Sequence, residues 1–256
     1  MKNQYLFTKD IIEKAASLIN KRQNKVLKIS YKKGAFNLVT NVDKEIDNFL
    51  VKKIKSAFPE HTIIAEESGM HNKNQKFKWF IDPIDGTTNF AHGYPCFCIS
   101  IGFSVNDKLE FGLVKNPYTG ELYTAQRGKG AKLNNKLIKV SKIKELKDSL
   151  LVTGFSYDRK KGRSNNFKCF KKITLMTQGV RRDGAAAMDL CYVAAGKLDG
   201  FWEFQLSPWD VAAGVLILKE AGGKITSFKG EKYSIYDKHI VASNGLVHKE
   251  LIKQLK

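Results

Sequence analysis

Two carboxylates lie three residues apart in the segment Asp-Pro-Ile-Asp-Gly-Thr-Thr-Asn-Phe, which spans residues 82–90. This segment directly follows the apolar run Trp79-Phe80-Ile81, so a predicted strand ends in acids, a glycine and two hydroxyls. Close carboxylates favour protonation unless a cation neutralises them, and oxygen ligands suit Mg²⁺. The segment therefore predicts a metal and phosphate centre. A surface Asp-Gly turn with solvated acids is the competing interpretation.

Two further predicted elements carry acids at their ends. Glu66-Glu67 follows the strand-like run Thr62-Ile63-Ile64-Ala65, and Asp210 begins the apolar helical segment 211–221. An acid at a helix start is commonly only a cap. Open α/β sheets, however, bind ligands at the ends of their strands, so we expect these acids to converge with Asp82 and Asp85.

Three stretches resemble the signature segments of the inositol monophosphatase family: Ala65–Gly69, Asp82–Phe90 and Trp209–Gly214. The resemblance runs from about residue 8 to the end, includes residues 38–43 and 181–190, and is strongest for the bacterial branch. It implies an α/β fold with mixed sheets, layered as an αβαβα sandwich of the inositol monophosphatase and fructose-1,6-bisphosphatase type. It also implies a Mg²⁺-dependent, lithium-sensitive phosphatase.

The resemblance assigns metal-binding and catalytic roles to individual residues. Two ions would be held by four acids and one backbone carbonyl: Glu66, Asp82, Ile84, Asp85 and Asp210. Glu66 would lie near the incoming water, and Thr87 with Asp43 would orient and deprotonate that water. A third Mg²⁺ is a further expectation, which Asn37 weakens because relatives usually carry an acid at that position.

The same resemblance gives a set of substrate contacts. The polyol ring would face Arg181, Gly184, Ala185, Ala186 and Glu203, and the phosphate side of the substrate would meet Glu66, Ile84, Asp85, Gly86, Thr87 and Asp210. Glu203 follows an apolar stretch, where a buried lone acid is costly. A functional contact explains that cost, while an exposed strand end is the alternative.

The chemistry agrees with these roles. Hydrolysis of a phosphate monoester needs charge stabilisation on both the attacking and the leaving oxygen, which two metals about 3.5–4 Å apart supply. The protein then contributes mainly positioning and electrostatics. Residues 86–89 resemble a helix start, whose N–H groups could cradle a phosphate. No serine or cysteine nucleophile is required.

Other polar residues have simpler interpretations. Thr40 and Asp43 have the spacing of a capping box, which is compatible with a role for Asp43 in activating water. His92 reads as a surface residue. The four cysteines, Cys96, Cys98, Cys169 and Cys191, lack zinc-finger spacing and read as reduced, largely buried thiols.

The pattern along the chain alternates between helix and strand. Helices are predicted at 8–23, 41–57, 164–177, 184–195, 210–221 and 245–255, and strands at 62–65, 78–81, 97–105, 109–115, 122–125, 150–155, 199–204 and 239–243. Successive hairpins in the first half favour an antiparallel or mixed sheet. We place a lobe boundary near residue 146, which divides one catalytic unit into lobes 1–146 and 147–256.

The composition indicates a basic enzyme of moderate size. The 256 residues can bury one large core or two packed lobes, and no run is long and apolar enough to span a membrane. We therefore expect a soluble, cytoplasmic protein without membrane contacts. The formal charge of +19 comes mostly from dispersed lysines, with only six arginines. An A+T-rich genome explains this composition, while attraction of anionic partners is the alternative.

Three functions remain open on the sequence. The leading one is hydrolysis of a small phosphorylated polyol, myo-inositol monophosphate first, by a metal-activated water. Fructose bisphosphate, a nucleotide phosphate or histidinol phosphate is the alternative substrate; the Thr-Thr-Asn-Phe that follows Gly86 resembles the inositol form. The third function is transcription antitermination through contact with RNA polymerase or a nucleic-acid-associated partner, as in some bacterial relatives. The resemblance also implies a homodimer.

Overall fold

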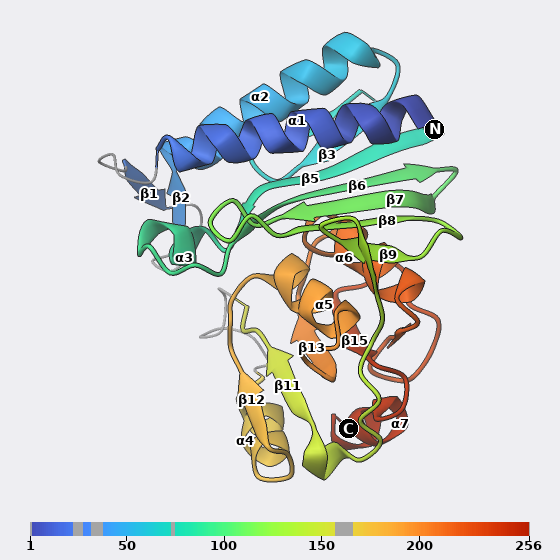
Figure 1. Ribbon diagram of the computed structural model, residues 1–256. Coiled ribbons are helices and arrows are strands. Elements are labelled where there is room, and N and C mark those ends of the chain that lie inside the picture. Colours follow the sequence, from blue (N-terminus) through green and yellow to red (C-terminus); the bar gives the residue numbers. More distant parts are fainter. Residues whose placement is uncertain (1, 23–27, 32–37, 73–74, 157–165, 256) are drawn as a thin grey trace.

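The structure, a computed structural model, describes residues 2–22, 28–31, 38–72, 75–156 and 166–255. These residues form five layers, with helices and sheets alternating (Figure 1). The outer helices are α1 (Lys2–Asn20) and α2 (Asn41–Ala57) on one side, and α4 (Phe167–Thr174) and α7 (His248–Gln254) on the other. Between the two sheets lie α5 (Ala186–Ala194) and α6 (Pro208–Glu220). The predicted αβαβα sandwich is confirmed.

The first sheet has eight strands in the order β10-β9-β8-β7-β6-β5-β3-β4. Their bounds are β3 Thr62–Ala65, β4 Gly69–His71, β5 Phe77–Asp85, β6 Cys98–Val105, β7 Lys108–Lys115, β8 Leu122–Gln126, β9 Ala131–Leu133 and β10 Lys136–Ile138. All pairs are antiparallel except β3 and β5, which run parallel with Ala65 opposite Ile81. Because parallel strands run in the same direction, Glu66, which follows β3, lies next to Asp82 on β5.

The second sheet has five strands in the order β12-β11-β13-β15-β14. Their bounds are β11 Leu150–Thr153, β12 Gly179–Arg181, β13 Gly200–Phe204, β14 Lys224–Thr226 and β15 His239–Ser243. The strand β11 pairs in parallel with both β12 and β13, so these three strands end at one edge. Smaller elements are a hairpin of β1 (Ile29–Tyr31) and β2 (Leu38–Thr40), helix α3 (Thr87–Ala91) and a 3₁₀ turn at Leu146–Asp148.

Three apolar clusters fill the spaces between the layers. One packs α1 and α2 on the outer face of the first sheet, and a second surrounds α5 and α6 between the sheets. The third joins the second sheet to α4 and α7. Burial of apolar surface in these clusters is the main source of stability in such a fold.

The long predicted elements are present, with shifted ends. Helix α1 begins at Lys2 instead of residue 8, the strand predicted at 78–81 extends over Phe77–Asp85, and α4 is shorter than the predicted 164–177. Seven strands of three residues, β1, β2, β4, β9, β10, β12 and β14, were not predicted. Three residues are too few to show an alternating apolar pattern, so these segments form strands because they pair with a neighbouring strand. The lobe boundary near residue 146 lies between the sheets and stays a prediction.

A pair of glycines lets α6 lie directly on the first sheet. Gly102 and Gly112 face each other across β6 and β7. A Cβ on Gly102 would lie 2.7 Å from Ala212 Cβ, and one on Gly112 would lie 2.7 Å from Ala213 Cα. The missing side chains therefore set the height of α6 above the sheet, and with it the position of Asp210 at the start of the helix.

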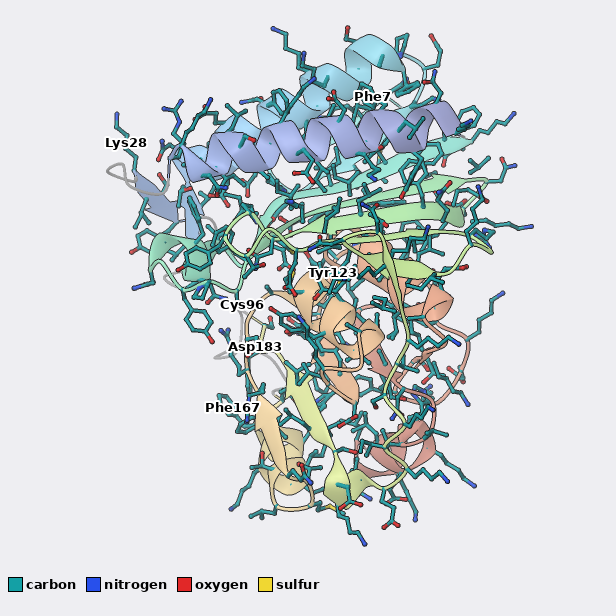
Figure 2. The ribbon with its side chains drawn as sticks, viewed as in Figure 1. Phe7, Lys28, Cys96, Tyr123, Phe167 and Asp183 are labelled. Atoms are coloured by element: carbon teal, nitrogen blue, oxygen red, sulfur yellow. The ribbon has the colours of Figure 1, made fainter. Side chains whose placement is uncertain are left out.

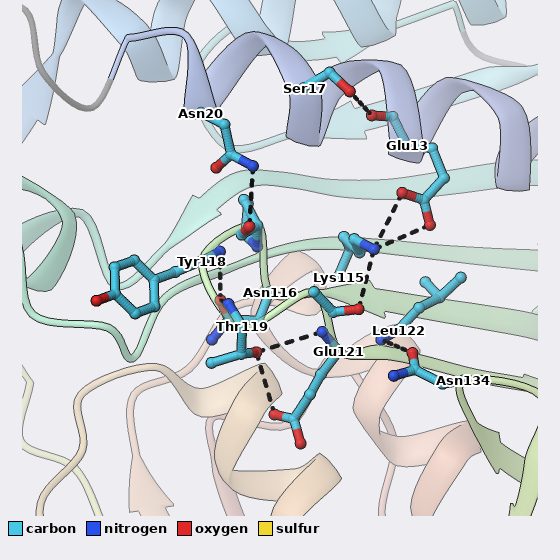
Figure 3. A network of polar contacts seen from close by, with 12 residues as sticks. Glu13, Ser17, Asn20, Lys115, Asn116, Tyr118, Thr119, Glu121, Leu122 and Asn134 are labelled. Carbon is cyan, nitrogen blue, oxygen red and sulfur yellow. Dashed lines mark hydrogen bonds and ion pairs between the residues drawn. The ribbon is translucent and has the colours of Figure 1, made fainter.

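Polar contacts tie α1 to the same sheet. Lys115 Nζ donates to Glu13 Oε1 at 3.1 Å and to the Gly120 carbonyl at 3.2 Å, and Asn20 Nδ2 donates to the Pro117 carbonyl at 3.1 Å (Figure 3). Within the described residues, no helix has the length and apolar character needed to cross a bilayer.

Candidate active site

The acids predicted to converge share one pocket. The pocket holds about 540 Å³ of space between its walls, part of which is open to solvent. Its walls come from both sheets and from the starts of α3, α5 and α6. It is lined by Glu66, Asp82, Ile84, Asp85, Gly86, Thr87, Gly154, Phe155, Arg182, Gly184, Ala186, Glu203, Leu206 and Asp210.

Strand β5 presents two of these acids. Its pairing with β6 shifts register between Asp82 and Asp85, so the strand bends where it leaves the sheet. Asp82 Oδ1 accepts from the Ile84 N–H at 3.0 Å, and Asp85 Oδ2 accepts from the Ala187 N–H at 2.6 Å. The second contact ties the end of β5 to the first turn of α5.

Asp210 is held as part of a helix cap. Its Oδ2 accepts from the Ser207 N–H at 2.7 Å, and Pro208 occupies the first turn of α6. The prediction that this acid caps a helix is therefore confirmed for Oδ2 of Asp210. The residue nevertheless lines the pocket, so capping and a role in the site are compatible.

The acids raise one another's pKa values. Burial, followed by the charge of Glu66, raises the pKa of Asp82 well above its ordinary value, and the same two causes act on Asp210. Burial also raises the pKa of Asp85 to about 7, against the hydrogen bond from Ala187. Removal from water and mutual repulsion both disfavour the charged form, and both would be offset by a cation.

Asp43 and Thr87 form a hydrogen-bonded pair beside these acids. Asp43 is 1% exposed and completes a capping box with Thr40 at the start of α2. Its Oδ2 accepts from the Thr40 N–H at 2.9 Å, and its Oδ1 lies 2.8 Å from Thr87 Oγ1. The Ile84 carbonyl lies 3.1 Å from the same hydroxyl. One hydroxyl proton serves one acceptor fully, and a carboxylate is the stronger acceptor, which leaves carbonyl lone pairs of Ile84 available.

Helix α3 follows the acids through a glycine that no other residue can replace easily. Gly86 has φ +90°, and a Cβ there would lie 2.9 Å from the Cys96 carbonyl oxygen. Asn89 Nδ2 donates to the Cys96 and Asp183 carbonyls, each at 2.6 Å. Figure 2 shows Cys96 and Asp183 close together between the two sheets. Asn89 therefore fastens α3 to the loop that precedes α5.

The second sheet supplies the far wall of the pocket. Glu203 lies on β13, and burial, together with the charge of Asp85, raises its pKa to about 8 against the opposing effect of Arg182. Gly184 and Ala186 line the wall beside it. Two predicted contacts lie elsewhere: Arg181 is an exposed residue of β12, and Ala185 is buried at the start of α5.

Four pocket residues were not assigned to the site from the sequence. They are Gly154, Phe155, Arg182 and Leu206. Arg182 is the neighbour of the predicted Arg181, and a side-chain period of two near a strand end means that neighbouring residues face different ways. Gly154 and Phe155 follow β11, so the expectation that strand ends converge could have found them.

His92 is exposed, as expected. All four cysteines are free; Cys96, Cys98 and Cys191 are buried and Cys169 is half-buried. Asn37, on which the third-metal prediction depends, lies outside the described residues.

The donor set fits Mg²⁺. Among the described residues, no three His, Cys, Asp or Glu side chains are already arranged as a closed metal-binding cluster. Instead, Asp82, Asp85 and Asp210 share the pocket, each with one oxygen held by a backbone N–H. Carboxylate and carbonyl oxygens are the ligands that Mg²⁺ prefers, and its charge would offset the repulsion among the acids.

The five layers and the acidic pocket define a layered α/β protein with an enzyme-like site at its strand ends. The sequence pattern of the inositol monophosphatase family matches residues 2–256. Inositol-1-monophosphatase from Synechocystis is 46% identical over 90% of this chain and 81% of its own length. Nus factor SuhB from Vibrio cholerae is 44% identical over 88% of this chain and 84% of its own length.

Solved structures agree with the sequence comparisons. Inositol monophosphatase from Anabaena superposes with a TM-score of 0.90 at 40% identity, over 100% of this chain and 96% of that chain. This chain belongs to the inositol monophosphatase family. Membership of this family makes the protein a phosphatase in broad class.

Proposed function

We propose that this protein is a Mg²⁺-dependent phosphatase that hydrolyses a small, sugar-like phosphate monoester, with myo-inositol monophosphate as the first candidate. The observation that carries the proposal is the convergence of Glu66, Asp82, Asp85 and Asp210 in one pocket. These acids come from the ends of β3 and β5 and the start of α6. Such a group of like charges, with the Thr87–Asp43 pair beside it, suits metal-assisted hydrolysis.

Two Mg²⁺ ions, when bound, would stabilise charge on the attacking and leaving oxygens of the ester. The residues that would hold them are the four acids and the carbonyl of Ile84. The acids' hydrogen bonds to the backbone keep their side chains oriented before a cation arrives, which lowers the cost of assembling the site.

Asp43 and Thr87 provide a route for the proton of the attacking water. Thr87 Oγ1 can accept a hydrogen bond from water while it donates its own proton toward Asp43 Oδ1. As the water attacks phosphorus and the bond from phosphorus to the ester oxygen breaks, one water proton passes to Thr87 Oγ1 and the Thr87 proton passes to Asp43, while the leaving oxygen takes a proton from solvent water. Burial raises the pKa of Asp43, which makes it a stronger base than an exposed aspartate.

The wall formed by Glu203, Gly184 and Ala186 lies where the polyol would bind. Glu203 offers a carboxyl group to ring hydroxyls, and the two small residues leave room for the ring. Arg182 joins this wall and replaces Arg181 in the proposed contacts. This half of the pocket would decide between inositol phosphate and other phosphate esters.

A panel of esters tests the proposal. The purified protein would be assayed with Mg²⁺ against myo-inositol 1-phosphate, fructose 1,6-bisphosphate, adenosine 3′,5′-bisphosphate and histidinol phosphate. We expect the highest kcat/KM for inositol phosphate, no turnover in EDTA, and inhibition by lithium. A higher kcat/KM for another ester would identify that ester as the substrate, and turnover that persists without divalent ions would contradict the mechanism.

A second candidate function is contact with the transcription machinery. The observation in its favour is that the Vibrio cholerae relative carries the name Nus factor. The formal charge of +19 is compatible with an anionic partner. Binding of the pure protein to RNA polymerase at physiological salt, retained in Asp85→Asn, would show a role separate from catalysis. Absence of binding by the unaltered protein would remove this candidate.

We also propose that the protein acts as a homodimer, as the resemblance implies. Analytical ultracentrifugation at micromolar concentration would test this: a monomer at all concentrations would contradict it.

A further inference from the structure

The end of strand β11 lies beside Glu203. Thr153 pairs with Trp202 in the parallel register of β11 and β13, so the next residues, Gly154 and Glu203, stand beside each other where both strands reach the pocket. Side chains at neighbouring positions of paired strands point to the same side of a sheet. Gly154 has no side chain to place there, and the longer side chain of Glu203 uses that space.

The carboxyl group of Glu203 fills the volume that a side chain on Gly154 would need. A Cβ on Gly154 would lie 2.1 Å from Glu203 Oε1, 2.2 Å from Cδ and 2.3 Å from Oε2. Gly154 is not among the glycines with positive φ, so its backbone conformation does not require glycine. The requirement at this position is therefore space for Glu203.

A hydrogen-bond network holds the backbone of Gly154 in place. Asn166, which is 2% exposed, donates through Nδ2 to Thr153 Oγ1 at 2.6 Å and to the Gly154 carbonyl at 2.8 Å. Its Oδ1 accepts from Trp202 Nε1 at 2.6 Å, and Thr153 Oγ1 donates to the Trp202 carbonyl. Since these contacts are buried, the Gly154 backbone cannot withdraw cheaply. The flexible end of Glu203 is the part that moves.

We propose that Gly154 is a specificity-determining position: its missing side chain forms the recess in which the Glu203 carboxyl group lies, and the depth of this recess sets how far Glu203 reaches into the polyol half of the pocket. The inference rests on the proposed function, because it takes Glu203 to face the polyol. A larger residue at position 154 would push the carboxyl group into the space of the ring. Gly154 acts through Glu203 and is a positioning residue.

A double-mutant cycle tests this inference, with Gly154→Ala, Glu203→Ala and the two combined. The readout is the ratio of kcat/KM for myo-inositol 1-phosphate to kcat/KM for p-nitrophenyl phosphate, which has no polyol hydroxyls. We expect Gly154→Ala to lower this ratio about tenfold or more, mainly through KM for the inositol ester. In the Glu203→Ala background the same change should have no further effect, because nothing remains to be displaced. Gly179→Ala, a glycine of the same sheet outside the pocket, is the matched control.

Thermal unfolding gives a second readout that does not depend on activity. Gly154→Ala should lower Tm, and the combined variant should recover it, because the collision is with the Glu203 side chain. Two outcomes would overturn the inference. One is that Gly154→Ala lowers the kcat/KM ratio by the same factor with and without Glu203→Ala. The other is that the Tm of the combined variant stays as low as that of Gly154→Ala. If the unaltered protein hydrolyses neither ester, the proposed function fails, while recovery of Tm still decides whether Glu203 occupies the recess.

Discussion

Asp43 and Asp210 occupy the same place in their helices, three residues after a Thr or Ser cap. Each carboxylate gives one oxygen to its own helix start. In Asp43 the other oxygen meets Thr87, and Asp210 lines the pocket. A helix cap fixes a side chain that would otherwise rotate freely. At the scale of single residues, local folding signals therefore also orient the site.

Asp85→Asn distinguishes the effect of this acid on stability from its effect on turnover. An asparagine can still accept from the Ala187 N–H through its oxygen, so the fold should be kept. Turnover should fall by orders of magnitude, because a neutral amide binds Mg²⁺ poorly. In EDTA, Tm should rise by a few degrees, about 1 kcal/mol, since one buried like charge is gone. Near-normal turnover would remove Asp85 from the site.

The pH dependence of stability in EDTA follows from the same residue. The pKa of Asp85 is raised from 3.8 to about 7 in the folded chain, so the folded state binds the extra proton between these values. Stability without metal should therefore decrease as pH rises from about 4 to 7, and Asp85→Asn should flatten this slope. Urea unfolding at a series of pH values measures it. Equal slopes for both proteins would show that burial does not raise the pKa of Asp85 in the folded chain.

Thr87→Val tests the proton route. Valine has the shape of threonine without the hydroxyl, so the packing around this residue, 6% exposed, is kept. We expect kcat to fall about 10²–10⁴-fold, the usual contribution of general acid–base catalysis. Thr87→Ser keeps the hydroxyl and should retain most of the activity. If serine and valine reduce kcat equally, the hydroxyl is not part of the route.

At the scale of elements, two arrangements bring the site together. Parallel pairing of β3 with β5 places Glu66 next to Asp82, and close packing of α6 on Gly102 and Gly112 brings in Asp210. The first could be anticipated, because acids follow both apolar runs in the sequence. The second could not, because nothing local shows that two glycines of different strands face each other beneath a helix.

Gly112→Ala should move α6. Its Cβ would lie 2.7 Å from both Cα and O of Ala213, and the backbone of a packed helix cannot yield as a side chain does. We expect a loss of about 1–3 kcal/mol in the free energy of unfolding and a lower kcat through displacement of Asp210. Ser104→Ala, in the same sheet, is the control: within the described residues its buried hydroxyl has no hydrogen-bond partner. An unchanged free energy of unfolding for Gly112→Ala would show that α6 does not pack closely on Gly112.

At the scale of the whole molecule, the pocket exists only because the layers are stacked in this order. Its acids come mainly from the first sheet and from α6, while Glu203 comes from the second sheet. The acids at element ends are local signals that the residues themselves predicted, while the layers were expected from the resemblance to the family. The sequence did not predict that Arg182 lines the pocket or that Glu203 occupies the space at Gly154, because these depend on which side chains face each other across distant strands.

Helix α7, which covers the second sheet, contributes a separate pH dependence to the stability of the protein through His248. His248, 1% exposed, lies 2.9 Å from both Thr226 Oγ1 and Ser243 Oγ. Burial lowers its pKa from 6.5 to about 4, so the unfolded chain binds a proton between these values and the folded chain does not. This residue should therefore reduce stability as pH falls from about 6.5 to 4, by about 2 kcal/mol at pH 5.

Comparison with His248→Gln isolates that contribution from the opposite effect of the acids in the pocket. Urea unfolding at pH 7 and pH 5 should show a smaller loss for the variant than for the unaltered protein. The same loss in both would place the acid sensitivity elsewhere.

Acids from separate elements should bind divalent cations together. Crystals soaked in Mn²⁺ and phosphate, measured at a wavelength where manganese scatters anomalously, show whether they do. We predict anomalous peaks within coordination distance of Asp82, Asp85, Asp210 and Glu66, with phosphate beside them. A pocket without a peak at saturating Mn²⁺, or peaks found only elsewhere on the surface, would show that these acids do not form a divalent-cation site.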